Sequence, residues 1–578
     1  MIRIVIGNKD VVLSDDMTFD FIRENAMLTK ASDYTYDIDI DLRIPANKQL
    51  YSHIDRINSS NRPTDRIAEI WDNNKLLVRG TEAILKVEGY KAKIQILANN
   101  SALNYAFDDN VKVRSLDFGT CETRSKVAAT SLIGKFYGDN DGTVYECYPL
   151  VKVGDKLYNG LFGSGNEYDE DELRPMPFVL FLLDKLIESL GYSIGENHIN
   201  QSKYRRLCVI HGYDTDEYAK MLPNWTVREM IEEYEKFFNV VFFFNSIDKV
   251  VDILSVDTFY QTVGDEFVGV DDVIDEHDCD YGSSSENMQN SYVHVGYKLP
   301  SSEIWKFQNI PSEVYDLCGK EDKLLVLHEE QVYDPKDLRI FKDTVKNVEW
   351  INWEQADDGD DDDDEAKYPM LVNMLRDYAE DADVSKTELR IIPAWCESGT
   401  VVDHNNKMYL TAVVDEAQLG SGNLSDVIRG GDETTYDTMQ VSFYLGNVHL
   451  ASTYDGSSLL SDVMYPAVRS VYWQQYKGLP WTLEPVQTGG VITTTPTITL
   501  ELCGQSGRVN TEMHNAVYID DKKLYTIKFK TRKFLDPRKK FVIANRLWYC
   551  KQLKYKVERG GVDVIVEGEF YPAKTLSN

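Results

Sequence analysis

Apolar and polar residues alternate with a period of two in short runs through residues 1 to about 155, a pattern typical of β-strands. The opening IRIVI, followed by GNKD and VVL, predicts a hairpin. Further strands are predicted at KLLVRGTEAILKVEG (75–89) and KAKIQILA (91–98). The preceding segment NRPTDRIAEIWDNN (61–74) contains the turn that leads into them. No stretch here has strong helical periodicity, so a β-barrel or β-sandwich is expected.

The pattern becomes helical after residue 175. PFVLFLLDKLIESLG (177–191) predicts a buried helix that begins at a proline and ends at a glycine. NWTVREMIEEYEKFFN (224–239) predicts a second helix, in which Thr226 and Glu229 fit a capping box and Asn239 suits a left-handed C-terminal residue. VVFFF and VVDIL follow on either side of NSIDK and predict a hairpin. Residues 170–260 are thus expected to form a small α+β unit.

The segment from 261 to 430 is harder to interpret. Its acidic run DDGDDDDDE (357–365) repels itself and predicts a solvated loop rather than a metal site. The following YPMLVNMLRDYAEDA (368–382) predicts a helix. From about 435 strands return, and DPRKK and ERGG supply turns that predict a closing β-meander and a second barrel. The strands expected there are TMQVSFYLG (438–446), TPTITLELC (495–503), KLYTIKFKT (523–531), KFVIANRLWYCKQLKYKV (540–557) and VDVIVEGEFY (562–571).

The fold class expected from these patterns is mainly β, with two barrel-like domains and α+β insertions. A chain of 578 residues is long enough for about four domains. The divisions are an N-terminal barrel (1–160), an α+β insertion with two helices and a hairpin (161–265), a mixed insertion that holds the acidic loop (266–430) and a C-terminal barrel or meander (431–578).

The segment YTYDIDIDL (34–42) alternates aspartates with apolar residues. Period two places Tyr34, Tyr36, Ile38, Ile40 and Leu42 on one buried face of a strand, and Asp37, Asp39 and Asp41 on the other. An EF-hand calcium loop that began at Asp37 would need glycine at its sixth position and glutamate at its twelfth, where the chain has Leu42 and Lys48. The pattern predicts a half-buried strand with an acidic face.

Composition and charge narrow the class of protein. The chain is 43% hydrophobic and 27% charged, and its longest strongly apolar run, FVLFLL, is too short to span a membrane. No signal peptide is evident at the N-terminus, and the eight cysteines are scattered, which favours reduced thiols inside a cell. The net charge of −33 argues against a general nucleic-acid binder.

The negative charge is unevenly distributed. Residues 521–578 hold 15 Lys and Arg against 6 Asp and Glu, a net of +9, so the preceding 520 residues carry −42. This basic end either reflects charges on exposed strand faces or docks an acidic neighbour, such as another copy of the chain. The candidate docking residues are Lys528, Lys530, Arg532, Lys533, Arg538, Lys539 and Lys540.

Motifs of catalysis and cofactor binding are missing from the sequence. HEEQV (328–332) lacks the second histidine of a zinc protease, and DEHDCD (275–280) offers His277 and Cys279 without a second ligand pair. GSG (163–165) and GQSG (504–507) miss the register of a nucleophile elbow, and neither dinucleotide nor phosphate-loop fingerprints occur. We therefore expect no catalytic residue, no metal and no cofactor, although the 95 acidic side chains leave a pair for glycoside hydrolysis open.

Three stretches resemble a known family. DDMTFDFIRENAMLTKASDYTYDIDIDLRIPANKQLYSHIDRINSSNRP (15–63) resembles the opening of phage and prophage tail proteins of the baseplate-hub type. TVREMIEEYEKFFNVVFFFNSIDKVVDIL (226–254) is similar to the helix-and-hairpin insert of such hubs, and FVIANRLWYCKQLKYKVERGGVDVIVEGEFY (541–571) to their closing meander. Together these cover about a third of the chain.

The resemblance implies a ring of three copies at the distal end of a tail tube. Each chain would contribute two barrels to the ring, and inserted domains would lie outside it. The expected partners are the chain itself as a homotrimer, tail-tube proteins and spike or fibre proteins, with DNA only in transit and no membrane insertion. The protein would be assembled in the host cytoplasm and located in the virion, at the tail tip. Any peptidoglycan-cleaving enzyme would be another polypeptide.

In such a ring, Asp37, Asp39 and Asp41 would either line the lumen and repel DNA phosphate or face solvent outside. An alternative from a different class is an intracellular-lineage β-rich protein that binds or hydrolyses glycans, suggested by the 35 tyrosines and many carboxylates. An intracellular scaffold unrelated to phage is a further alternative. Host, tail type and the role of residues 266–430 do not follow from the sequence.

Overall fold

The structure is a computed structural model that describes most of the chain. The described residues are 1–101, 111–159, 173–256, 267–281, 294–298, 386–401, 437–448, 523–573 and short pieces between 338 and 513, without 30, 60–62, 64, 65, 122–124, 140–143, 155, 246, 247 and 271. The acidic run 357–365 and most of the strand expected at 495–503 lie outside them.

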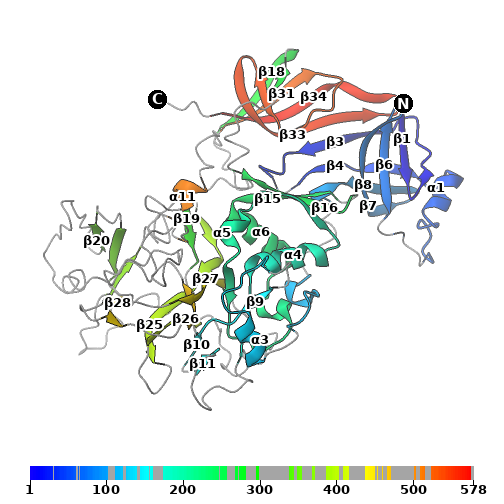
Figure 1. The fold of residues 1–578 in the computed structure, drawn as a ribbon. Helices are drawn as coiled ribbons and strands as arrows, with labels where there is room; N and C mark the ends of the chain where they lie inside the picture. The colour runs from blue at the N-terminus through cyan, green and yellow to red at the C-terminus, as the bar shows by residue number, and fades with distance from the viewer. Residues whose placement is uncertain are drawn as a thin grey trace, which may run out of the picture.

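One 14-stranded sheet contains strands from both ends of the chain. In Figure 1 the blue N-terminal strands and the red C-terminal strands lie together, above the remaining elements. The strand order is β18-β31-β34-β33-β3-β4-β8-β7-β6-β1-β2, while β5 pairs with β8, and β32 pairs with β17 and β33. The strands are β1 (Ile2–Ile6), β2 (Lys9–Asp10), β3 (Thr18–Glu24), β4 (Asp33–Thr35), β5 (Ile38–Asp41), β6 (Ile67–Asp72), β7 (Lys75–Glu88), β8 (Lys91–Leu97), β17 (Val268–Val270), β18 (Val273–Tyr281), β31 (Lys523–Lys530), β32 (Lys540–Ile543), β33 (Arg546–Glu558) and β34 (Gly561–Pro572).

The two ends of the chain meet where β3 pairs with β33. This antiparallel ladder runs from Thr18 opposite Glu558 to Glu24 opposite Gln552. A single apolar core backs both halves, with Ile4, Phe21 and Phe570 among its buried members. The expectation of two separate closed barrels is therefore not confirmed: the described strands from the two chain ends form one open sheet over one core, and the mainly-β class is confirmed.

The sheet curls but does not close. Its β33–β34 turn reaches β1 through one backbone hydrogen bond, from the N–H of Ile2 to the carbonyl of Arg559 (3.1 Å). The main path of strands ends at β2 and β18. A closed barrel would need a continuous ladder at that point. The short helix α1 (Pro45–Leu50), which the strand pattern did not predict, lies beside β5.

The second core belongs to the inserted α+β unit, where the sequence predictions are confirmed. α4 (Val179–Ser189) buries its apolar face, and α6 (Val227–Phe238) begins with the predicted capping box: Thr226 Oγ1 accepts from the N–H of Glu229 at 3.1 Å, and Glu229 Oε2 accepts from the N–H of Thr226 at 2.7 Å. Asn239 ends α6 with φ 52°. β15 (Val240–Asn245) and β16 (Val250–Ser255) form the predicted hairpin.

Segments far apart in sequence complete this unit. β27 (Met439–Val448), which the sequence groups with residues 431–578, pairs with β14 (Leu207–Ile210) and β24 (Ile391–Pro393).

The prediction of a helix at 368–382 is wrong at its start, because β22 (Tyr368–Leu371) is a strand that pairs with β21 (Val348–Trp353). The periodicity of a short apolar run does not distinguish a helix from a strand, and pairing with β21 decides it here.

The other elements are short. They are η1 (Val113–Ser115), α3 (Lys126–Ser131), β9 (Glu146–Cys147), β10 (Val151–Val153), β11 (Lys156–Tyr158), β12 (Met176–Pro177), β13 (Ser193–Asn197), α5 (Gln201–Tyr204), η4 (Tyr218–Met221), β19 (His294–Tyr297), β20 (Leu338–Asp343), β23 (Lys386–Leu389), β25 (Trp395–Val401), β26 (Met408–Val414), β28 (Ser452–Thr453), β29 (Ser458–Leu459), β30 (Tyr465–Arg469) and α11 (Arg508–Thr511).

A third, smaller apolar cluster joins the sheet to the α+β unit. Met27 from the β3–β4 loop packs in it with Val241 of β15 and Tyr549 of β33. Asn100 reinforces the joint, since its Nδ2 donates to the carbonyl of Phe242 at 2.7 Å and its Oδ1 accepts from the N–H of Phe244 at 2.9 Å. The joint thus fixes β15 against the sheet.

Candidate functional site

The acidic segment is divided between two strands. The predicted burial is confirmed for Ile38, Ile40 and Leu42, but Tyr36 is 48% exposed and that part of the prediction is wrong. The chain leaves β4 before Tyr36, whose N–H donates to the carbonyl of Asp20, and the alternation changes phase before β5 begins. A continuous period of two cannot reveal such a break.

Lys91 and Arg43 pair with two of the three aspartates on the acidic face. The Arg43 guanidinium hydrogen-bonds to Asp41 and lowers the pKa of that carboxyl. On β7 and β8, Lys86 and Lys93 pair with Glu88 beside these groups. The face therefore carries both signs of charge. The partners of the three aspartates are Gln95 Nε2 for Asp37 (3.2 Å), Lys91 Nζ for Asp39 (2.9 Å) and the Arg43 guanidinium for Asp41 (2.8 Å).

The seven basic residues selected from the sequence occupy different environments. Lys528 pairs with Glu567 at 3.5 Å, and Arg538 pairs with Asp536 at 2.8 Å. Lys540 is buried, at 5% exposure, and Lys539 is exposed. Only part of the set is thus available to a partner. The exposed residues without a carboxylate partner among the described part of the chain are Lys530, Arg532 and Lys533.

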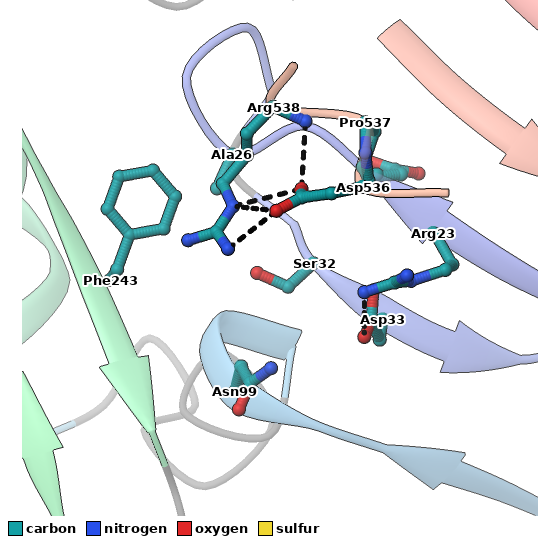
Figure 2. A pocket seen from close by; sticks show the side chains of 10 residues that line it. Arg23, Ala26, Ser32, Asp33, Asn99, Phe243, Asp536, Pro537 and Arg538 are labelled. Atoms are coloured by element: carbon teal, nitrogen blue, oxygen red, sulfur yellow. Dashed lines mark hydrogen bonds and ion pairs between the residues drawn. The ribbon is translucent and has the colours of Figure 1, made fainter. Parts of the chain in front are cut away.

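An open pocket lies at the joint between the sheet and β15. Its walls come from the β3–β4 region, the β31–β32 connection and Phe243 of β15 (Figure 2). Ion pairs form two of these walls: Arg23 Nε lies 3.2 Å from Asp33, and Arg538 lies against Asp536. Sequence reasoning missed this site, because its segments are more than 500 residues apart.

The pocket's charges are satisfied within its own walls. Burial opposes ionisation of Asp536, but the hydrogen bonds from Arg538 prevail and lower the pKa of that carboxyl. Arg23 also donates to the carbonyl of Leu535 (2.8 Å), and Arg538 stacks over Phe243 at 5.5 Å. With each guanidinium already paired, this arrangement suits a structural joint better than a catalytic or anion-binding centre.

The sequence patterns also did not identify two buried polar groups of the α+β unit, Glu146 and Arg114. Burial raises the pKa of Glu146, whose carboxylate accepts from the Tyr218 hydroxyl at 2.6 Å and from the Cys121 thiol at 3.5 Å. Arg114 is only 9% exposed and lies over the Tyr213 ring at 4.9 Å, and its three guanidinium nitrogens have no hydrogen-bond partner among the residues that the structure describes. No local sequence pattern marks either residue.

We expect Glu146→Gln to stabilise the protein more at pH 7 than at pH 4. A carboxyl whose folded pKa is raised contributes stability below its unfolded pKa and loses it as pH rises through the folded pKa, so the buried carboxylate is unfavourable at neutral pH. Glutamine keeps an acceptor for Tyr218 without the charge, and we expect a gain of roughly 1 kcal/mol at pH 7. Urea unfolding at both pH values measures it.

The exposed Glu196→Gln is the matched control, and its effect should be small at both pH values. An equal effect of Glu146→Gln at pH 4 and pH 7 would contradict the assignment of a burial-perturbed carboxyl.

Within the described residues, no group of three or more His, Cys, Asp or Glu side chains could hold a metal ion. The five cysteines described, Cys121, Cys147, Cys208, Cys279 and Cys550, are free thiols. Among helices in these same ranges, none has the length and apolar character needed to cross a bilayer. His277 and Cys279 lie on the edge strand β18, where His277 stacks on Tyr525.

Neither a family model nor a curated protein matches the chain. Three solved structures resemble it over nearly its whole length. The tail protein from Neisseria meningitidis MC58 is 8% identical, with 99% of this chain and 95% of that chain covered and a TM-score of 0.32. The 43 kDa tail protein of prophage MuSo2 from Shewanella oneidensis is 6% identical, with 98% of this chain and 97% of that chain covered and a TM-score of 0.32. A prophage tail protein from Listeria monocytogenes EGD-e is 6% identical, with 100% of this chain and 95% of that chain covered and a TM-score of 0.31. Similarity of this degree does not establish a shared fold or function.

Proposed function

We propose that this chain is a structural component of a phage or prophage tail tip, without enzymatic activity. Three copies would form a ring-shaped baseplate hub that joins the tail tube to a spike or fibre and lets DNA pass. The proposal starts from the resemblance of residues 15–63, 226–254 and 541–571 to baseplate hubs. These three stretches are brought together in the protein, since β3, β15 and β33 all meet at the joint.

The observation that carries the proposal is the joining of both chain ends in one sheet. Ring subunits need a rigid platform, and the β3–β33 ladder makes one from segments about 530 residues apart. The α+β unit lies to one side of that sheet (Figure 1), which is the arrangement expected of an insert outside a ring. The ladder ends at β2 and β18 offer edges that a neighbouring subunit could cover.

A lumen position for Asp37, Asp39 and Asp41 is a weaker part of the proposal. Because Lys91 and Arg43 pair with two of these carboxylates, the face would repel DNA less than three unpaired aspartates. The alternative of a glycan-binding or glycan-hydrolysing protein has no specific support at the pocket, where the polar groups mostly pair with one another.

The purified protein is expected to form closed rings of three copies. Mass photometry over a range of concentrations and negative-stain imaging would measure copy number and shape. Rings with a central opening would support the hub. A protein that stays monomeric with tail-tube and spike proteins present, or that cleaves oligosaccharides, would contradict it.

A further inference from the structure

Three cations and one aliphatic side chain are exposed at the end of β31, and we name them the β31 patch. Lys530 lies opposite Ile565 in the β31–β34 ladder, and the N–H of Thr531 donates to the carbonyl of Val564 at 2.8 Å. These contacts place the two segments side by side. The members of the patch are Lys530, Arg532, Lys533 and Ile565, and the side chain of Ile565 is 39% exposed.

The charge of the β31 patch is unpaired, in contrast to the rest of the same sheet face. Farther along β31, Lys528 pairs with Glu567 of β34, and Lys554 of β33 pairs with Asp20 of β3 at 3.1 Å. The face is thus charge-balanced from β3 to β31, up to the last residue of β31. Over the part of the chain that the structure describes, no carboxylate pairs with the three cations of the patch. The excess of positive charge on this face is thus confined to the end of β31.

We propose that the β31 patch binds an acidic surface of a second copy of this chain. Residues 521–578 carry +9, whereas the other 520 residues carry −42, so the rest of another copy supplies abundant complementary charge. Anionic membranes and nucleic acids would be repelled by the remaining −42, which disfavours them as partners. This inference rests on the proposed ring and names the surface that would assemble it.

The sign of the patch limits the kind of contact. A twofold axis through the patch would bring Lys530, Arg532 and Lys533 against their own equivalents, and like charges in contact are unfavourable. The patch therefore contacts a different, acidic surface of its neighbour, and the proposed ring requires this contact to be head-to-tail. Such contacts close into a ring when the rotation allows it. Ile565 would lose water at the contact, and the cations would set its orientation.

Reversing the charge of the β31 patch should weaken self-association. In the full chain, the triple variant Lys530→Glu, Arg532→Glu, Lys533→Glu is expected to associate roughly tenfold to a hundredfold more weakly than the wild type. The corresponding triple alanine variant should show a smaller loss. Sedimentation velocity at low and high salt measures both, and rising salt should weaken the wild type toward the variants.

The matched control reverses three exposed cations away from the β2 and β18 edges, Arg56→Glu, Lys156→Glu and Lys249→Glu, and so changes net charge equally. It should associate nearly as well as the wild type, and all variants should keep the wild-type melting temperature within a few degrees. Rings that persist in the β31 variants overturn this inference but leave the hub proposal standing. A wild type that never self-associates overturns both, and so does a monomer whose β31 patch instead binds phosphatidylserine vesicles or duplex DNA.

Discussion

Replacing Gly80 with alanine is expected to destabilise the protein by about 3 kcal/mol or more. Gly80 is a buried residue of β7 opposite Ala68, and an added Cβ would lie 2.1 Å from the carbonyl oxygen of Leu97 and 2.7 Å from its carbon. The obstacle is backbone of β8, which cannot rotate away as a side chain can. Relief of the clash requires β7 and β8 to separate. Urea unfolding at neutral pH would measure the loss.

Gly560→Ala provides the matched control for this substitution. Gly560 lies in the β33–β34 turn with no atom within 4 Å of an added Cβ. The same chemical change there should alter the free energy of unfolding by less than about 0.5 kcal/mol. Equal stabilities for the two variants would show that β7 does not approach β8 as closely as described.

Replacing Asn25 with alanine should cost about 3 kcal/mol and loosen the joint between the two ends of the chain. The buried Asn25 donates from Nδ2 to the carbonyls of Pro537 and Cys550 at 3.1 and 3.0 Å, and its Oδ1 accepts from the N–H of Met27 at 3.1 Å. Alanine would leave these groups without their partner in a site closed to water. Thermal unfolding measures the stability, and hydrogen exchange at residues 534–539 should rise.

Ser32→Ala is the control for Asn25→Ala, because Ser32 is a buried polar residue close to Asn25 in the sequence, and its hydroxyl donates no hydrogen bond among the contacts described. It should change stability by less than about 0.5 kcal/mol. If Asn25→Ala were as mild as Ser32→Ala, the pocket walls would be held by the apolar cluster of Met27, Val241 and Tyr549 alone.

Gly80 and Asn25 are relevant to the proposed function because both stabilise the sheet that joins the two chain ends. Gly80 lies in the N-terminal half of the sheet, and Asn25 connects that half to the C-terminal strands. A ring subunit transmits load only if its two halves move together. A variant at Asn25 that folds but no longer forms rings would therefore indicate that assembly depends on this connection.

Local signals made much of the chain predictable. The capping box of Thr226 and Glu229, the left-handed Asn239 and the β15–β16 hairpin depend on residues three to fifteen positions apart, and all are present. The long hairpin strands β7 and β8 and the closing strand β34 also follow their predicted ranges closely, whereas a turn at Ala544 and Asn545 divides the single strand predicted at 540–557 into β32 and β33. In each case turn residues and side-chain periodicity act on the same short segment.

Predictions failed where a local pattern was compatible with two arrangements. Tyr36 continues the alternation of YTYDIDIDL, yet the break between β4 and β5 exposes it. YPML suits a helix or a strand, and the partner strand β21 decided for a strand. The seven basic residues at the C-terminal end look equivalent in sequence, but Glu567 and Asp536 neutralise two of them.

The sequence by itself determined the mainly-β class, the position of the α+β unit, the caps of α6 and the uneven charge, because each depends on composition or on neighbours along the chain. Only the tertiary structure decided that β3 pairs with β33, so that two predicted barrels form one sheet over one core. It also decided which charges stay unpaired: Asp39 finds Lys91 on β8, whereas Lys530, Arg532 and Lys533 find no carboxylate in the described part of the chain. The physical reason is distance along the chain, since a pairing between residues hundreds of positions apart has no local pattern and is selected by the packing of the whole sheet.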